Sequence, residues 1–527
     1  MKEKYYITTP IYYPSANFHI GHCYTTIIAD SIARYQRLKE KDVFFLTGTD
    51  EHGQKIENKA KEKGVTPKEY VDEIVENAKD LWKSLGISYD KFIRTTDEYH
   101  EKAVQKIFDK LYEQGDIYLD KYKGLYCTPC ESFWTETQLV DGKCPDCGRE
   151  VSLVEEESYF FRLSKYQKRI EELYKTNPEF IKPESRKNEM INNFLKPGLE
   201  DLCISRTTFD WGIPMPNDPK HVLYVWLDAL TNYITALGYM SDDDSLFKKY
   251  WPADIQIIGK DILRFHAIYW PIFLMALNLP LPKKIFVHDF IMMKDGKMSK
   301  SKGNTIYPDT LAKEYGVDSV RYTILRSLPY GQDGEFTPSF FIEKYNTELC
   351  NDLGNLVNRS IAMINKYFNG FITKTNTKTD FDDKLDNYIN DEINLYEKEI
   401  ESINIQNAIS HIMNIVSRTN KYIDETTPWV LAKEEKTDLL NQVMYNLYNT
   451  IRKIGILLYP FIPDTSNKIL EQLNIHDENL TSYNSLKTTL DLTGNKVEEK
   501  VSPLFQRLDA KKEEEKLIEL MKTDNEK

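Results

Sequence analysis

The sequence predicts an α/β fold with a split parallel sheet, followed by an all-α helix bundle. Three observations support this prediction. A strand–helix–strand pattern occurs near the N-terminus and again after residue 254, four of the seven cysteines fall between the two patterns, and the last third of the chain has helical periodicity without strands. At about 150 residues per domain, the 527 residues correspond to three or four domains.

The first pattern begins with a β-rich segment over residues 5–9. Residues 21–38 carry apolar side chains at helical spacing, and residues 43–46 form a second, fully apolar strand. A strand, a helix and a strand in so short a span form a βαβ unit, which requires parallel strands. We expect this first half of the sheet domain to cover residues 1–118.

The second pattern has a strand over residues 255–258, a helix over 261–277 and a strand over 284–291. Two βαβ halves predict a doubly wound, Rossmann-like sheet. We expect its second half to cover residues 223–325 and to include a lysine-rich loop. The segment 119–222, with the cysteines and several prolines, is predicted to be a separate small module inserted between the halves.

The remaining chain is predicted to form a helix bundle, because long amphipathic segments follow one another without strands. The apolar residues that share a face are Ile405, Ile409, Ile412 and Val416 in one segment and Val443, Leu447, Ile451, Ile454 and Leu458 in another. Pro460 and Pro463 are expected to end the second helix. We expect a linker over residues 326–348, the bundle over 349–500 and a charged tail over 501–527.

The composition excludes several classes of protein. Lys and Arg number 69 against 82 Asp and Glu, and 41% of the residues are hydrophobic, which is ordinary for a globular chain. This balance excludes a disordered chain, a collagen-like fibre and a histone-like coat for nucleic acid, although a local basic patch can still bind nucleic acid. Since the sequence has no long apolar run and no secretory or transit segment, we expect no membrane span and a cytoplasmic location.

The motif His19-Ile20-Gly21-His22 lies between the first strand and the first helix. Open α/β sheets bind ligands at this end of their strands. A helix N-terminus offers free N–H groups and a positive dipole end to phosphate, and a glycine lets a nucleotide approach the backbone. The alternative is that the two histidines cap the helix or form half of a metal site.

A second motif, Lys297-Met298-Ser299-Lys300-Ser301, follows the last predicted strand. Lysines in such a loop can close over a polyphosphate and neutralise its charge. The alternative is a solvated basic loop. The sequence contains neither a Walker A motif nor G-x-G-x-x-G, which argues against P-loop and dinucleotide-binding proteins.

Two C-x2-C pairs, Cys127/Cys130 and Cys144/Cys147, are separated by 13 residues. This spacing supplies four thiolates for tetrahedral Zn²⁺, and the prolines and glycines beside both pairs suit the tight turns of such a site. Because four sulfur ligands leave no open position, we expect one structural zinc ion and not a catalytic one. Free thiols or a redox pair are the alternative.

The histidine and lysine motifs together resemble the signature of the class I aminoacyl-tRNA synthetases. The segments around them resemble the methionyl-tRNA synthetases, and the resemblance extends to about residue 505. These segments are Thr9-Pro10-Ile11-Tyr12-Tyr13, Thr47-Gly48-Thr49-Asp50-Glu51-His52-Gly53, Val225-Trp226-Leu227-Asp228-Ala229 and Gly259-Lys260-Asp261.

The resemblance implies that methionine is activated with ATP and Mg²⁺ and transferred to tRNA(Met). The implied methionine-binding residues are Ile11, Tyr13, Asp50, Trp226, Tyr233, Phe265, His266 and Trp270, with Asp50 facing the substrate ammonium. The implied ATP-binding residues are His19, Gly21, His22, Gly259, Asp261, Lys297 and Lys300, of which the two histidines and the two lysines are catalytic. Aromatic rings suit a polarizable thioether, but ordinary core packing is the alternative for Phe265 and Trp270.

In the helical part, Asn355 and Arg359 share one helix face, and Trp429 lies between two long helices. The resemblance implies that these three residues contact the anticodon, with the indole stacking on a base. The alternative for Trp429 is a buried position in the bundle. Family members often continue into a further dimerising module beyond a segment like residues 503–505, and we expect a monomer here.

Three other functions are compatible with parts of this pattern. They are a synthetase for another amino acid, a zinc-ribbon RNA-binding protein without catalysis, and a small-molecule nucleotidyltransferase. Amino-acid-dependent ATP–pyrophosphate exchange distinguishes all three from the predicted function.

Overall fold

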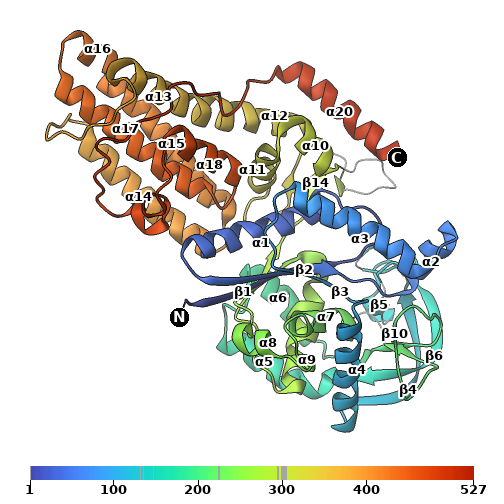
Figure 1. Ribbon diagram of the computed structural model, residues 1–527. Helices are drawn as coiled ribbons and strands as arrows, with labels where there is room; N and C mark the ends of the chain where they lie inside the picture. Colours follow the sequence, from blue (N-terminus) through green and yellow to red (C-terminus); the bar gives the residue numbers. More distant parts are fainter. Residues whose placement is uncertain are drawn as a thin grey trace. The chain divides into compact units, whose positions relative to one another are not determined.

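The computed structural model describes residues 2–130, 132–134, 136–145, 147–223, 226–293, 296–297 and 306–526 (Figure 1). The chain divides into two compact units. The first comprises the residues up to Phe18, then Asp42–Lys83 and Ile87–Asp289, and the second comprises His19–Lys41, Ser84–Gly86 and the chain from Phe290 onward. The helix after the first strand therefore groups with the C-terminal part of the chain. The sequence alone predicts this helix in the first half of the sheet domain, residues 1–118.

The first unit is built on a six-stranded parallel sheet. In spatial order its strands are β3 (Lys91–Arg94), β2 (Asp42–Thr49), β1 (Lys4–Tyr12), β12 (Ile255–Gly259), β13 (Ile285–His288) and β7 (Ile181–Lys182). The central strands are buried along most of their length, as expected for a parallel sheet covered on both faces. The predicted split sheet is confirmed, because β1 and β12 are neighbours although more than 240 residues separate them.

Helices connect the strands of this unit. They are α2 (Gln54–Lys63), α3 (Pro67–Ser84), α4 (Glu98–Glu113), α5 (Gln167–Thr176), α6 (Glu184–Met190), α7 (Trp226–Thr235), α8 (Ser245–Tyr250) and α9 (Trp270–Leu277). The predicted helix over 261–277 is interrupted. It begins as a 3₁₀ turn, passes through a π-helical turn, Phe265–Tyr269, and continues as α9.

The insertion contains two small antiparallel sheets. The larger has the order β5 (Ser132–Trp134), β4 (Ile117–Cys127), β6 (Ser152–Phe161), β8 (Leu202–Cys203), and the smaller has the order β10 (Ile213–Pro214), β11 (Val222–Leu223), β9 (Ser205–Arg206). One strand from the segment predicted as a separate small module joins the main sheet, because β7 pairs with β13. This short strand covers the edge that β13 would otherwise expose.

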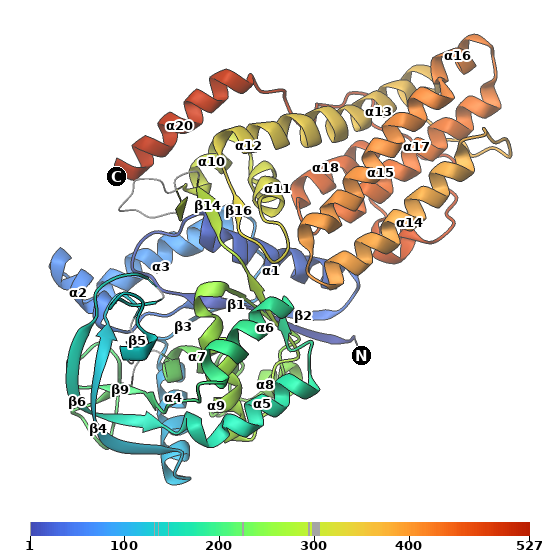
Figure 2. The same cartoon turned by 180° about the vertical axis from the view of Figure 1, so that it is seen from behind.

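The second unit is mainly helical (Figure 2). Its helices are α1 (Ile20–Leu38), α10 (Pro308–Tyr315), α11 (Val317–Ser327), α12 (Pro338–Lys344), α13 (Asn355–Phe368), α14 (Asp382–Glu401), α15 (Ile405–Thr426), α16 (Pro428–Lys433), α17 (Thr437–Leu458), α18 (Pro463–Gln472), α19 (Glu478–Thr481) and α20 (Ala510–Glu526). A π-helical segment, Tyr345–Gly354, joins α12 to α13. A small sheet has the order β15 (Gly296–Lys297), β14 (Ile291–Met293), β16 (Gly334–Glu335), so the predicted strand over 284–291 divides between two sheets.

The bundle confirms the helical periodicity. Every predicted face residue of α15 and α17 is buried, α17 ends at Leu458 before Pro460, and Pro463 begins α18. The charged tail folds as α20, whose residue Glu513 accepts a hydrogen bond from the Tyr315 hydroxyl at 2.7 Å. Among the described residues, no helix is both long and apolar enough to span a membrane.

Candidate functional site

The two histidines of the first motif cap helix α1. His19 is the N-cap residue, and its Nδ1 atom accepts a hydrogen bond from the Gly21 N–H at 3.1 Å. In return, Nδ1 of His22 accepts from the His19 N–H at 3.1 Å, which completes a reciprocal capping box. Burial and the neighbouring His19 lower the pKa of His22 well below its ordinary value. The capping alternative is therefore correct as a structural description, and it leaves both rings at a positively polarised helix terminus.

Gly21 has a specific steric reason to be glycine. A Cβ atom there would lie 2.9 Å from Cε1 of His19, so any larger residue would push on the capping ring. Of the lysine motif, the backbone of Lys297 belongs to β15, whereas Lys300 lies outside the described residues. The two lysine assignments therefore stay predictions.

Five of the predicted methionine-binding residues form one cluster in the first unit. The ring of Trp226 stacks on Phe265 with centroids 3.4 Å apart, and Tyr233 packs against Trp270 at 5.6 Å. The fifth member, His266, is described below. We call these residues the aromatic cluster: Trp226, Tyr233, Phe265, His266 and Trp270. Trp270 is fully buried and Phe265 nearly so, which means that both are core residues, whatever else they do.

His266 has a defined protonation state within this cluster. Its Nδ1 atom lies 3.0 Å from the carbonyl oxygen of Ile262, which only accepts, so this nitrogen carries the proton. Burial lowers the pKa of His266 to about 4. The ring is therefore neutral at pH 7, and Nε2 accepts the hydrogen bond from the Tyr233 hydroxyl at 2.7 Å. The π-helical turn that carries Phe265 and His266 is of a kind often found at functional sites.

Ile11 and Tyr13 lie at the end of β1 and just beyond it, and they pack against different hydrophobic cores. Ile11 packs against the main hydrophobic core, which includes most of the aromatic cluster. Tyr13 instead packs with Trp211 against a smaller core formed by α2 and α3. The structure thus brings together five of the eight predicted methionine-binding residues in the aromatic cluster. Ile11 packs elsewhere on the same large core, Tyr13 belongs to the smaller core, and Asp50 lies in the segment described next.

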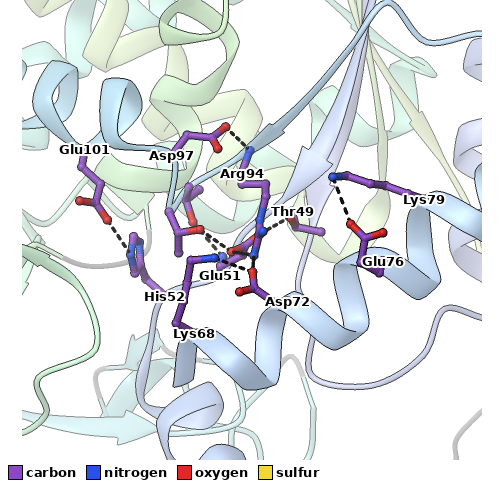
Figure 3. Close-up of polar contacts among 12 residues, drawn as sticks. Thr49, Glu51, His52, Lys68, Asp72, Glu76, Lys79, Arg94, Asp97 and Glu101 are labelled. Atoms are coloured by element: carbon purple, nitrogen blue, oxygen red, sulfur yellow. Dashed lines mark hydrogen bonds and ion pairs between the residues drawn. The ribbon is translucent and has the colours of Figure 1, made fainter. Parts of the chain in front are cut away.

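Asp50 follows β2 and is largely buried; its backbone N–H donates to the Tyr12 carbonyl at 2.9 Å. The next residue, Glu51, is fully buried and bound by Arg94 through two hydrogen bonds of 2.7 and 2.8 Å. Figure 3 shows this pair together with Asp72, whose carboxylate pairs with the same Nη2 atom of Arg94 that donates to Glu51. The hydroxyls of two threonines also donate to Glu51. These contacts fix the backbone that presents Asp50.

Sequence reasoning missed a buried polar network beside Asp50. His52 and His100 both contact the carboxylate of Asp228, each at 2.7 Å. His52 and Asp228 lie in segments that carried the resemblance, but no role was assigned to either. His100 offered a weak signal, since it occupies the apolar stripe of α4 with Ala103, Val104 and Ile107.

The two remaining nucleotide-binding predictions lie at the end of β12, which ends at Gly259, and just beyond it. A Cβ on Gly259 would lie 2.6 Å from Oδ1 of Asp261, so the glycine permits this carboxylate to fold back over the strand end. Asp261 is exposed. Both residues lie at the carboxyl end of a central parallel strand, as expected for a ligand-binding position.

The four cysteines converge on one point. All four sulfur atoms lie within 4.8 Å of one another, with Cys127 and Cys147 at 3.6 Å and Cys130 and Cys144 at 3.9 Å. Tetrahedral Zn–S bonds of about 2.3 Å require sulfur–sulfur distances near ~3.8 Å. Gly142 and Gly148 have positive φ angles of 73° and 70°, which only glycine adopts readily. The donor set and its spacing fit a structural zinc ion.

The bundle places its predicted residues on accessible helix faces. Asn355 begins α13 and is exposed. Arg359, one turn later, reaches Asp424 near the end of α15 at 3.3 Å. Trp429 in α16 is 47% exposed, so the alternative of a buried tryptophan is wrong. We call Asn355, Arg359 and Trp429 the bundle set.

Comparison with known proteins places the chain in a family. The sequence matches the family described as tRNA synthetases class I (M) over residues 5–153 and 147–361. It also matches the anticodon binding domain of methionyl tRNA ligase over residues 372–518. The chain belongs to the methionyl-tRNA synthetase family.

Relatives of the methionyl-tRNA synthetase family match nearly the whole chain. A methionine–tRNA ligase of Clostridium perfringens is 58% identical over 521 residues, which is 98% of this chain and 80% of the relative. A methionine–tRNA ligase of Bacillus subtilis is 55% identical, over 97% of this chain and 78% of the relative.

A solved structure of the family agrees with the fold. Mycobacterium tuberculosis methionyl-tRNA synthetase in complex with methionyl-adenylate superimposes with a TM-score of 0.91 and 40% identity, covering 96% of this chain and 100% of that one. The predicted fold class, family and enzyme class, an aminoacyl-tRNA ligase, are confirmed. The individual site residues stay predictions.

Proposed function

We propose that this chain is a methionine–tRNA ligase, which activates L-methionine with ATP and transfers it to tRNA(Met). The observation that carries the proposal is the full-length similarity to a methionyl-tRNA synthetase solved with methionyl-adenylate. The aromatic cluster and the Asp50 segment supply, within one unit, the two chemical features that methionine requires. Its thioether is soft and favours aromatic rings, and its ammonium requires an anion.

Methionine recognition is divided between these two features. Asp50 binds the ammonium, and Ile11, Tyr13 and the aromatic cluster surround the side chain. The neutral state of His266 matters here, because a charged imidazolium beside a thioether would have to be desolvated on binding. The Tyr233–His266 hydrogen bond satisfies both polar groups internally, which keeps the surroundings of the thioether apolar.

Nucleotide binding is assigned to His19, Gly21, His22, Gly259, Asp261, Lys297 and Lys300, with Mg²⁺ accompanying ATP. The N-terminus of α1 offers N–H groups and a favourable dipole to phosphate, and the lysines supply positive charge. Asp261 is suited to accept hydrogen bonds from the ribose hydroxyls. His19, His22, Lys297 and Lys300 act by positioning and by stabilising charge in the transition state.

The reaction proceeds in two steps. The methionine carboxylate attacks the α-phosphorus of ATP, and the bond to pyrophosphate breaks, which gives methionyl-adenylate. A terminal ribose hydroxyl of the tRNA then attacks the activated carbonyl carbon and loses its proton as AMP leaves. Neither step requires a covalent bond to the protein, so catalysis depends on alignment and charge.

The bundle set is assigned to the anticodon. An exposed indole on a short helix can stack under a splayed base, and the amide of Asn355 and the guanidinium of Arg359 can read base edges. The four-cysteine cluster is assigned one structural Zn²⁺ per chain, whose binding energy contributes to folding of the insertion. We further propose a monomer that acts in the cytoplasm.

The proposal is tested by ATP–pyrophosphate exchange with each of the twenty amino acids, followed by aminoacylation of tRNA(Met). We expect exchange that depends on methionine, and charging of tRNA(Met) that is lost when its CAU anticodon is replaced. Exchange driven best by another amino acid would indicate a different synthetase. Absence of exchange with all twenty would contradict a ligase function altogether.

A further inference from the structure

The strongest unassigned feature is the buried network of His52, His100 and Asp228. Asp228 and His100 are fully buried, and His52 is 2% exposed. Nδ1 of His52 lies 2.7 Å from Oδ2 of Asp228, and Nε2 of His100 lies 2.7 Å from Oδ1. Each carboxylate oxygen therefore has its own imidazole, and the second nitrogen of His100 lies 2.7 Å from the Thr235 hydroxyl.

The network joins the two features of the proposed methionine site. His52 stands two residues after Asp50, on the segment that leaves β2. Asp228 lies in the first turn of α7, two residues after Trp226 and five before Tyr233. His100 comes from α4 and holds α7 at two points, Asp228 and Thr235. The Asp228 carboxylate is thus the direct link between the backbone that carries Asp50 and the helix that carries two rings of the aromatic cluster.

The charge state of the network supports a rigid link. Burial acts to lower the pKa of His52, but the neighbouring Asp228 and Glu101 carboxylates raise that pKa to about 10. Burial acts to raise the pKa of Asp228, and the two histidines lower it below its ordinary value. At neutral pH the contact is therefore a buried ion pair. Such a pair tolerates little displacement, because separation would leave an uncompensated charge in the interior.

The surroundings contain few other charges. Glu101 of α4 lies 3.5 Å from Nε2 of His52, as Figure 3 shows. The His52 ring packs in a T-shaped arrangement with Trp211, whose indole N–H donates to the Glu51 carbonyl at 2.6 Å. The positive charge of Arg94 is directed to Glu51 and Asp72. No arginine or lysine in the described part of the chain forms an ion pair with Asp228.

We propose that Asp228, held between His52 and His100, is a positioning residue that sets the spacing between the ammonium-binding and thioether-binding parts of the methionine site. The proposal rests on the proposed function. Asp228 does not touch the substrate in this proposal; it acts through the segment of Asp50 and through α7. The feature that it controls is the length of the amino acid that the enzyme selects.

The test measures selection by length. The probes are methionine and homomethionine, the homologue with one additional methylene between the α-carbon and the sulfur, in ATP–pyrophosphate exchange. Asp228→Asn preserves the shape of the side chain and removes its charge. We expect the KM for methionine to rise roughly 10-fold or more, because a displaced binding group loses alignment, while the KM for ATP changes less than about 2-fold. The preference for methionine over homomethionine should fall by a similar factor.

A matched control separates positioning from general stability. Asp116 is 1% exposed and belongs to the same unit. Its carboxylate binds Lys165, with 2.5 Å between Oδ1 and Nζ, and Gln114, neither of which belongs to the aromatic cluster or to the Asp50 segment. Asp116→Asn makes the same chemical change and should lower the melting temperature without altering the methionine preference. If Asp228→Asn lowers only the melting temperature and leaves both the KM for methionine and the preference unchanged, the network is merely structural and the proposal is overturned.

A milder variant covers the case in which Asp228→Asn does not fold. Thr235→Val removes only the hydroxyl that contacts His100 and preserves the shape of the side chain. It should shift the methionine preference in the same direction by a few-fold, and an unchanged preference in this variant also counts against the proposal. Wild-type protein without methionine-dependent exchange would instead contradict the proposed function, so the two failures are distinguishable.

Discussion

The aromatic cluster and the bundle set use aromatic side chains in opposite ways. Trp270 is fully buried, and its indole N–H donates to Gln256 at 3.0 Å. Trp429 is 47% exposed on a six-residue helix. A small ligand is best bound by rings that are already fixed, because ordering them on binding costs free energy. An RNA base must reach its ring from solvent, so that ring has to stay exposed.

The polar contacts of the two regions differ as their aromatic rings do: those of the aromatic cluster are buried, and those of the bundle set are partly exposed. Around the cluster, key polar groups are paired with one another inside the protein, as in the Tyr233–His266 hydrogen bond and the Asp228 network. In the bundle set, Arg359 has a partially exposed ion pair with Asp424 that a phosphate or base can displace. Preorganisation therefore marks the proposed methionine site, and exchangeable contacts mark the proposed anticodon surface.

The largest expected effect is on stability in the cluster. Trp270→Ala should reduce the free energy of unfolding by about 3–5 kcal/mol, because it leaves a cavity in the core. Urea unfolding of the variant and the wild type measures the difference. A loss below about 1 kcal/mol would show that the cluster is not tightly packed and would remove the contrast with the bundle set.

The buried His266 should make stability depend on pH. Its pKa is about 4 in the folded protein and about 6.5 in the unfolded chain, so below pH 6.5 the unfolded state binds more protons. Its contribution is therefore full above pH 6.5 and is lost as the pH falls toward 4, by about 1.4 kcal/mol per pH unit and roughly 3 kcal/mol in total. Unfolding at pH 6.5 and 5.0 should show a smaller drop for His266→Gln than for the wild type. Equal drops would mean that His266 is not neutral when folded.

Asp50→Ala tests the anionic part of the site. A charge-assisted hydrogen bond is worth about 1.5–3 kcal/mol, so the KM for methionine in pyrophosphate exchange should rise roughly 10- to 100-fold. The KM for ATP should stay near the wild-type value. If the ATP parameters change and the methionine parameters do not, Asp50 serves the nucleotide instead.

Trp429→Ala is the counterpart of Trp270→Ala. Base–aromatic stacking is worth about 1–3 kcal/mol, so the KM for tRNA should rise roughly 10- to 100-fold while pyrophosphate exchange is unchanged. The free energy of unfolding should change much less than in Trp270→Ala, since about half of the side chain is exposed. A destabilised variant with a normal KM for tRNA would assign Trp429 to the packing of the bundle.

The smallest effect concerns the ion pair of Arg359. Asp424→Asn removes a partially exposed pair, which is worth about 0–1 kcal/mol. It also frees the guanidinium group and removes a negative charge that repels RNA. We expect a few-fold decrease in the KM for tRNA at low salt and a smaller decrease at high salt. A rise in this KM would indicate that Asp424 positions Arg359 for binding.

The sequence by itself determined which segments form helices and strands, and which motifs can bind a metal or a ligand. Periodicity alone located α15 and α17, because burial of one helix face repeats every few residues. The cysteine spacing predicted the convergence of four sulfur atoms, since two short knuckles have few ways to fold. The segments around Asp50 and Trp226 indicated the family, because several residues in each segment resemble those of the methionyl-tRNA synthetases together.

Only the tertiary structure decided what depends on contacts between distant residues. β7 joins the main sheet because a partner strand about 100 residues later leaves an edge open, which no local pattern reveals. The exposure of Trp429 follows from where α16 lies on the bundle, and burial of a lone aromatic has no sequence period. His100 reaches Asp228 across 128 residues, so a pairing that satisfies both buried groups became visible only once the chain was folded.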